Sequence, residues 1–194
     1  MIDSIVSARL VDSPASHAMY EYVVAGNGLW VRAQDDRMSA CIPVAYAHNP
    51  GLSDLAPHAY LKAGKIHSAY LRSIYKSALA NLPNEAAYQF SVCLADPVPY
   101  TVAMPRQVAT PTNVDYEDNP EAVVDLHSHG ELGAFFSSTD DADEQGLRFY
   151  VVVGELTSGL PTIKARVGVY GHHWKIDPLA IFTELYPFST LEEL

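Results

Sequence analysis

Two histidines at the end of one short apolar run most constrain how this chain can fold. Residues 122–126 are apolar and β-branched, which predicts a strand, and His127 and His129 follow two positions apart. Alternate side chains of a strand leave the same face, so both imidazoles should project together near the strand's end. The sequence therefore predicts the start of a metal site at this point.

Asp140 is the candidate third ligand. It lies in the segment Ser138-Thr139-Asp140-Asp141, whose Ser-x-x-Asp form is typical of a helix start. Two histidines and one carboxylate leave a fourth tetrahedral position for water. That arrangement is typical of hydrolytic zinc sites rather than of closed structural ones.

Other ligands remain open from the residues alone. Asp141 and Asp143 follow Asp140 closely and carry the same carboxylate group. The adjacent pair His172 and His173 could also add to a metal site. A hairpin turn, with one exposed ring and one packed ring, explains that pair without a metal.

Helical and strand patterns occur together in the chain and predict an α/β fold. Residues 66–82 repeat apolar side chains at helical spacing, and Pro83 should end this helix. Further strands are predicted at residues 86–94, 98–108, 148–154 and 162–170. Residues 110–120 should form a loop and residues 178–185 a C-terminal helix. We expect a mixed sheet with helices packed on it.

The first 65 residues are β-rich and are expected to form an extension of unknown role, followed by a domain at residues 66–194. Residues 19–25 and 29–33 flank Gly26-Asn27-Gly28, which predicts a hairpin. Residues 39–46 predict a third strand, which Pro43 should place at a sheet edge.

The string His127-Ser128-His129, followed by Ser137-Ser138-Thr139-Asp140, resembles the metal motif of the JAMM (MPN-plus, JAB) metalloproteases. The resemblance covers residues 66–176. It implies a cytidine-deaminase-like JAB/MPN sandwich, in which helices flank a mixed central β-sheet. It also implies that His127, His129 and Asp140 bind Zn²⁺.

The same resemblance implies two catalytic residues. Ser137 would stabilise the oxyanion of the tetrahedral intermediate, although a helix-capping role for its hydroxyl is the alternative, with Ser138 as the other possible cap. A glutamate after the first helix would be the general base, and Glu85, which follows Pro83 and precedes a strand, occupies that place. Zinc lowers the pKa of a bound water to roughly 7, so a nearby carboxylate can accept its proton.

Two positions depart from the family pattern. The family commonly has proline after the second histidine, where this chain has Gly130, and glycine three residues after the glutamate, where it has Tyr88. Gly130 should make the following loop more flexible, and Tyr88 bears on the strand geometry near Glu85. Neither departure removes a proposed ligand or catalytic group.

The implied activity is that of a zinc-dependent peptidase or isopeptidase acting at the C-terminus of a ubiquitin-like protein or its conjugate. A narrower similarity is to the protein A family of PRTRC plasmid cassettes, which sit beside ThiF-like and ubiquitin-like proteins. It implies a ThiF/E1-like partner. A non-catalytic MPN-like scaffold or partner-binding module is the alternative from another class.

A second hydrolase class shares part of the motif. Residues 125–129 alone also resemble the first metal motif of PHP phosphoesterases and amidohydrolases. Only 65 residues follow His129, which is too few to complete such a barrel.

Composition limits the partners. Twelve basic and 23 acidic residues give a formal charge of −11, which disfavours nucleic acid. No apolar run approaches the length of a membrane span, and the N-terminus lacks the pattern of a secretory signal. Cys41 and Cys93 fit small core residues in a reducing compartment, so we expect a cytoplasmic protein without a membrane or nucleic-acid partner.

Overall fold

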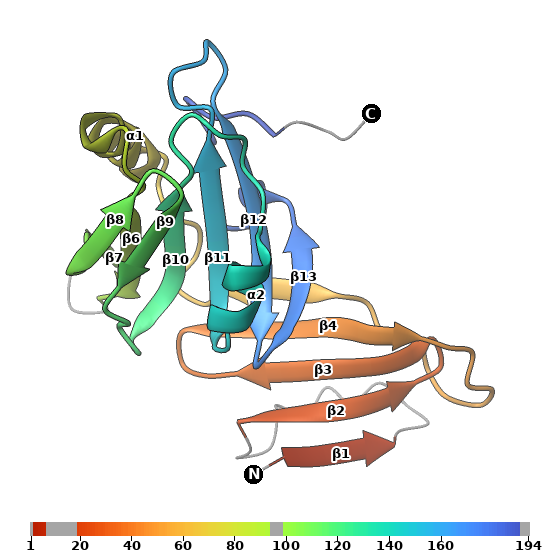
Figure 1. Cartoon of the computed structure of the whole chain (residues 1–194). Coiled ribbons are helices and arrows are strands. Elements are labelled where there is room, and N and C mark those ends of the chain that lie inside the picture. The colour runs from red at the N-terminus through yellow and green to blue at the C-terminus, as the bar shows by residue number, and fades with distance from the viewer. Residues whose placement is uncertain (1, 7–18, 94–98, 191–194) are drawn as a thin grey trace.

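Strands far outnumber helices in this protein. The computed structural model describes residues 2–6, 19–93 and 99–190, and it contains a central mixed sheet, a second sheet and few helices (Figure 1). The predicted mixed α/β class is confirmed at this level. The cytidine-deaminase-like arrangement, with helices flanking the sheet, stays a prediction.

The central sheet has six strands in the order β13-β12-β11-β10-β6-β7. Its strands are β6 (Ala87–Val92), β7 (Tyr100–Ala103), β10 (Ala122–Ser128), β11 (Leu147–Gly154), β12 (Thr162–Val169) and β13 (His172–Ile176). β10 runs parallel to β11, and the other neighbouring pairs are antiparallel. The parallel step needs a crossover, and the short helix α2 (Ser138–Asp143) lies in it.

Strand alternation gives this sheet one apolar face and one polar face. Val124 and Leu126 of β10 point into the hydrophobic core, so Asp125 and His127 face the opposite way. Helix α1 (Ala69–Asn81) packs into that same core through Leu71, Ile74 and Ala78. The candidate metal ligands are thus kept on the face that α1 does not cover.

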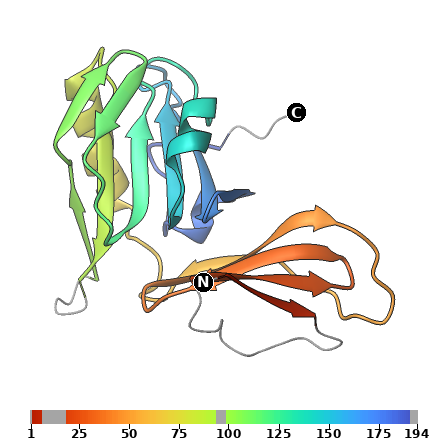
Figure 2. The same cartoon turned by 60° about the horizontal axis from the view of Figure 1, so that its bottom comes forward.

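A second sheet of five strands precedes α1 in the chain (Figure 2). Its strands, in sheet order, are β1 (Ile2–Val6), β2 (Tyr20–Ala25), β3 (Gly28–Gln34), β4 (Met38–Tyr46) and β5 (His58–Leu61). Val31 and Ile42 of this sheet belong to the same apolar core as Leu71 of α1 and Phe149 of β11. Both sheets therefore share one core.

The predicted hairpin β2–β3 is confirmed, but the edge position expected for Pro43 is wrong. β4 pairs with β3 on one side and with β5 on the other. β5 pairs only with the stretch from Met38 to Cys41, so Pro43 lies beyond the end of that ladder. Its missing N–H therefore costs no hydrogen bond to β5.

The predicted loop at residues 110–120 is partly a hairpin. β8 (Gln107–Thr110) pairs with β9 (Asn113–Tyr116), and the side chain of Thr110 donates to the carbonyl of Asn113 across the turn. The single strand predicted at 98–108 is divided between β7 and β8 by Pro105 and its neighbours. Residue 98 and residue 94, the end of the preceding predicted strand, lie outside the described residues.

The predicted C-terminal helix at residues 178–185 is wrong. Only a short 3-10 helix, η1 (Pro178–Ala180), forms there. Phe182 leaves the helical path to form a parallel bridge with Ile66, and the N–H of Thr183 donates to the carbonyl of Ile66. The same bridge delays the start of α1, which was expected at Ile66 and begins at Ala69. No helix of the described residues is long and apolar enough to cross a membrane.

Candidate metal centre

The two histidines of the motif converge as their spacing predicts. His127 lies in β10 and His129 directly follows that strand, and both side chains are buried. Their Nε2 atoms are 3.1 Å apart. Burial lowers the pKa of His127 to about 4 and also lowers that of His129. Both rings are therefore neutral at pH 7, the form that binds metals.

Asp140 completes the group. Its Oδ1 lies 3.5 Å from Nε2 of His127, while its Oδ2 accepts hydrogen bonds from the N–H and the hydroxyl of Ser137 at 2.6 and 2.7 Å. One carboxylate oxygen is thus held at the helix start, and the other faces the histidines.

The three ligand atoms fit a small metal ion. Those of His127, His129 and Asp140 all lie within 4.8 Å of one another. Zinc–ligand bonds of roughly 2.0–2.1 Å in a tetrahedron place ligand atoms about 3.3 Å apart. The two measured separations of 3.1 and 3.5 Å bracket that value.

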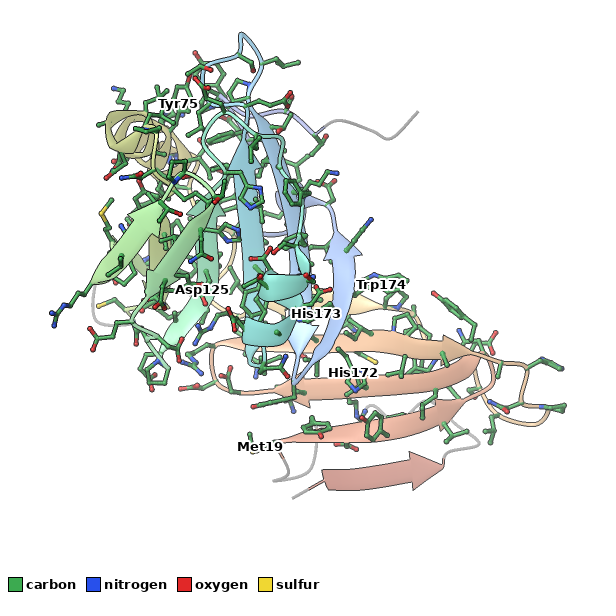
Figure 3. All side chains as sticks on the ribbon, in the orientation of Figure 1. Met19, Tyr75, Asp125, His172, His173 and Trp174 are labelled. Atoms are coloured by element: carbon green, nitrogen blue, oxygen red, sulfur yellow. The ribbon has the colours of Figure 1, made fainter. Side chains whose placement is uncertain are left out.

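The alternative ligands do not join this group. Asp141 pairs with Arg166 at 2.5 Å, and Asp143 is exposed. His172 lies 2.8 Å from the hydroxyl of Tyr22 on β2, whereas His173 lies 2.9 Å from the carbonyl of Glu144 after α2 (Figure 3). Among the described residues, the metal-binding geometry is confined to His127, His129 and Asp140.

A backbone carbonyl orients the second histidine. Nδ1 of His129 lies 3.2 Å from the carbonyl oxygen of Gly133, which can only accept a hydrogen bond. Nδ1 must therefore carry the proton in this contact, and Nε2 keeps its lone pair for a metal. Gly133 was not predicted as a site residue, because no side chain signals a carbonyl contact.

Glu85 is tied to the end of β10 by its neighbour in sequence. The N–H of Ala86 donates to the hydroxyl of Ser128 at 3.0 Å, and the N–H of Ser128 donates to the carbonyl of Ala86 at 2.9 Å. Ser128 stands between the two histidines, so this exchange fixes Glu85 beside them. The N–H of Glu85 also donates to the carbonyl of Thr110 at the end of β8.

The environment of Glu85 changes its acidity. The side chain is 6% exposed, and burial, followed by the nearby charge of Asp140, raises its pKa to about 7. A carboxylate with a pKa near the working pH suits proton transfer in both directions. The structure thus brings the predicted base to the predicted ligands.

Ser137, rather than Ser138, is the N-cap of α2. Its hydroxyl accepts from the N–H of Asp140 at 3.2 Å, and the carboxylate of Asp140 accepts from the N–H of Ser137, which is a complete capping box. The capping role that was the alternative for Ser137 is therefore confirmed. Ser137 lines the same cleft as the ligands, while its hydroxyl is engaged with Asp140. The oxyanion role stays a prediction.

A cleft of about 790 Å³ contains the site. Glu85 and the three ligands lie on its wall, with Leu132 and Phe135 as apolar neighbours. Strand β9 borders the cleft. The rest of the cleft lining includes five acidic residues and one arginine: Asp115, Asp118, Asp125, Asp143, Glu144 and Arg148.

Comparison with known proteins decides the family. Residues 67–167 match the family described as "Prokaryotic homologs of the JAB domain", which is just over half of the 194 residues. The chain belongs to this family. The predicted JAB/MPN relationship is confirmed, whereas the narrower similarity to the PRTRC cassettes is not tested by this match.

Other comparisons add little to the JAB assignment. The curated proteins contain no match to the chain. A protein of Desulfitobacterium hafniense, known from a solution structure, is 14% identical over 66% of this chain and 94% of its own, with a TM-score of 0.46. A likeness of that size carries no argument about fold or function. The family match includes every predicted site residue and begins after the N-terminal sheet.

The two departures from the family pattern have local explanations in this JAB domain. Gly130 has a φ of 56°, a left-handed conformation that the ring of proline cannot adopt. The carbonyl of Gly130 accepts from the N–H of Leu156, so the turn is held to the end of β11; its predicted flexibility stays a prediction. Tyr88 pairs regularly with Leu126, and the strand near Glu85 is undisturbed.

The loop after His129 packs closely on Gly154. A Cβ atom added there would lie 2.3 Å from the carbonyl oxygen of Leu132 and 2.6 Å from the nitrogen of Ala134. We expect Gly154→Ala to lower the free energy of unfolding by about 1–3 kcal/mol, because backbone atoms must move. Thermal unfolding measures this.

Gly159→Ala is the matched control for that substitution, since a Cβ atom there meets nothing within 4 Å. Its expected change is within about 0.5 kcal/mol. Equal melting temperatures for the two variants would contradict the close packing of the loop after His129 on Gly154.

Two buried arginines were also missed by sequence reasoning. Arg148 lies in β11 and contacts Asp118 and Asp125, and Arg166 lies in β12 and contacts residues of α2. Arg148 stands alone among apolar residues of its strand, which was the available signal, whereas Arg166 shares its strand with Lys164 and gave a weaker one. An arginine in such a run is retained inside the protein only with acidic partners.

Proposed function

We propose that this protein is a zinc-dependent JAMM-type peptidase or isopeptidase. In this proposal it hydrolyses an amide bond at the C-terminus of a ubiquitin-like protein or its conjugate. The observation that carries the proposal is the meeting of two neutral imidazoles, one carboxylate and a glutamate with a pKa of about 7 in one cleft. Membership of the JAB family supports it, although the family leaves a non-catalytic scaffold open.

The residues divide the chemistry between them. His127, His129 and Asp140 would hold Zn²⁺, which supplies a Lewis acid that activates water and polarises the scissile carbonyl. The carboxylate of Glu85 accepts a proton from the attacking water and then gives it to the nitrogen of the leaving amine. The hydroxyl of Ser137, which donates to Asp140 in this structure, would turn to donate to the carbonyl oxygen as negative charge develops there.

The position of Glu85 supports this order of proton transfers. In the metal-free protein its pKa is raised to about 7, which makes the carboxylate a stronger base than an exposed glutamate. Burial supplies most of that shift, so the protein, rather than the solvent, sets the basicity of this group.

The biological setting is part of the proposal. We place residues 66–194 in the JAMM domain and residues 1–65 in an extension of unknown role. A ThiF/E1-like protein is the proposed partner, without nucleic acid or membrane. Two free thiols, Cys41 and Cys93, support a cytoplasmic setting.

A metal-dependent cleavage assay tests the function. The substrates are ubiquitin and bacterial ubiquitin-like proteins that carry a fluorogenic amide at the C-terminus. We expect cleavage that stops with a chelator and returns with added Zn²⁺. A purified protein that binds no zinc and cleaves none of these amides would instead favour the non-catalytic scaffold.

Ser137→Ala tests the proposed donor. We expect kcat to fall about 10²–10³-fold with little change in KM, because the lost hydroxyl acts on charge that develops only in the transition state. The substitution also removes the capping box, so the free energy of unfolding should fall by about 1 kcal/mol. If zinc affinity falls in step with kcat, Ser137 acts through Asp140 rather than on the substrate.

A further inference from the structure

The helix that carries Asp140 has little of its own to hold it in place. α2 has six residues, and none of them is buried. Isolated helices of that length are unstable in water, because too few hydrogen bonds offset the cost of starting a helix. Its capping box fixes the first turn internally but does not attach the helix to the sheet. Something outside α2 must set where Asp140 points.

Arg166 of β12 makes the side-chain attachment to the helix acids, beside the contact of His173 with the carbonyl of Glu144. It is 5% exposed and lies on the polar face of the central sheet. Its Nε donates to Oε2 of Glu144, the residue that ends α2, at 2.6 Å, and its Nη1 donates to Oδ1 of Asp141 at 2.5 Å. Its guanidinium also lies over the ring of Phe136, 4.1 Å from the centroid.

The residues that Arg166 contacts lie on both sides of Asp140 along the chain. Phe136 precedes the cap, Asp141 follows Asp140 directly, and Glu144 closes the helix. A guanidinium can form two hydrogen bonds and one ring contact at once because it is planar and has donors on several sides. Of its two carboxylate partners, Glu144 is buried like Arg166 itself, and leaving either of these two groups inside the protein without the other would be costly.

We propose that Arg166 is a positioning residue for the metal centre: by holding α2 against β12, it sets Asp140 opposite the two histidines. This inference rests on the proposed metal site. Residues that orient metal ligands from outside the coordination sphere commonly change metal affinity about 10–100-fold when they are replaced. Arg166 itself is not among the residues that line the cleft.

The first test measures Zn²⁺ affinity by competition with a chromogenic chelator. Arg166→Met should bind Zn²⁺ about 10–100-fold more weakly than the unchanged protein. The Zn²⁺ affinity of Arg166→Lys should lie between those of Arg166→Met and the unchanged protein. An ammonium keeps the charge but cannot reach both carboxylates in the same planar geometry. Arg148→Met is the control for removal of a buried cation, since Arg148 contacts Asp118 and Asp125 and not α2.

A milder pair of variants covers the case in which Arg166→Met does not fold. Asp141→Asn and Asp143→Asn make the same charge change on exposed side chains of the same helix, but only Asp141 contacts Arg166. We expect Asp141→Asn to weaken Zn²⁺ binding about two- to fivefold relative to Asp143→Asn, as for the loss of one exposed ion pair.

Hydrogen exchange of the metal-free protein separates positioning from ligation. The N–H of Asp141 donates to the carbonyl of Ser137, and the N–H of Glu144 donates to that of Asp140. Both amides should exchange faster in Arg166→Lys and in Asp141→Asn, but not in Asp143→Asn.

The outcomes distinguish the two proposals. Unchanged exchange in α2, or equal Zn²⁺ affinity in the Arg166 variants and the unchanged protein, would overturn the role of Arg166. A protein that binds no Zn²⁺ in any form would overturn the proposed function instead, while the exchange measurement would still decide whether Arg166 holds α2.

Discussion

Glu85→Gln is expected to lower kcat for amide cleavage by about 10²–10⁴-fold while leaving Zn²⁺ bound. The amide keeps the size of the carboxylate but cannot accept a proton at neutral pH. Glu85 is not among the three residues whose ligand atoms converge, so metal content should not change. Steady-state cleavage of the C-terminal fluorogenic amides, with zinc content measured on the same sample, checks both parts.

The same substitution should stabilise the metal-free protein at neutral and alkaline pH. The folded-state pKa of Glu85 is about 7, above the ordinary value of 4.5. As pH rises between these values, the unfolded chain ionises this group first, so the folded state loses stability until the pH passes about 7. Glutamine removes that cost, which is about 3 kcal/mol when fully developed.

Urea unfolding of both forms between pH 5.5 and 8.5 measures this difference. The gain from glutamine should grow with pH and level off above about pH 8. Exposed Glu131→Gln is a matched control, since the same chemical change on a solvent-exposed side chain should leave activity unchanged. A Glu85 variant that cleaves as fast as the unchanged protein would remove Glu85 from the proposed mechanism.

Zn²⁺ at about 100 times its dissociation constant should stabilise the folded protein by about 2.7 kcal/mol. For a chain of this size, that corresponds to a rise in melting temperature of about 5–11 °C. The stabilisation arises because the three ligands converge only in the folded state. Differential scanning fluorimetry with and without a chelator measures it.

His127→Ala should abolish most of that rise, because it removes one of the three ligand atoms. His172→Ala is the control: this ring is also partly buried and bonded, but it contacts Tyr22 rather than the metal group. A full shift in His127→Ala would show that zinc binds elsewhere.

Local sequence spacing predicted that the two histidines converge, and the family resemblance favoured Asp140 over Asp141 and Asp143 as the third member of the group. His127 and His129 had to share a face once residues 122–126 were taken as a strand, and that strand is buried along its whole length. Glu85 was predicted as the general base because it follows the helix and Pro83, where the family resemblance implies a catalytic glutamate. Its raised pKa was not predictable, because burial depends on how β6, β8 and β10 come together.

The errors lie where distant contacts override local preference. Residues 178–185 have a helical pattern, but Phe182 and Thr183 instead bond to Ile66, more than a hundred residues earlier. The loop expected at 110–120 gains a strand because β8 and β9 pair across a short turn. The role of Arg166 was not predicted for the same reason, because its partners Asp141 and Glu144 lie in and directly after α2, more than 20 residues earlier in the chain.

The three proposed ligands lie close together along the chain, within residues 127–140, whereas Glu85 lies far earlier. Closing a short segment costs little chain entropy, and each doubling of loop length adds only about 0.6 kcal/mol. The ligand segment is therefore closed at little entropic cost once β12 holds α2, while the base depends on the pairing of β6 with β10. Ligands and base would thus depend on different strands of one sheet, so weakening the β6–β10 pairing would impair catalysis more than ion binding.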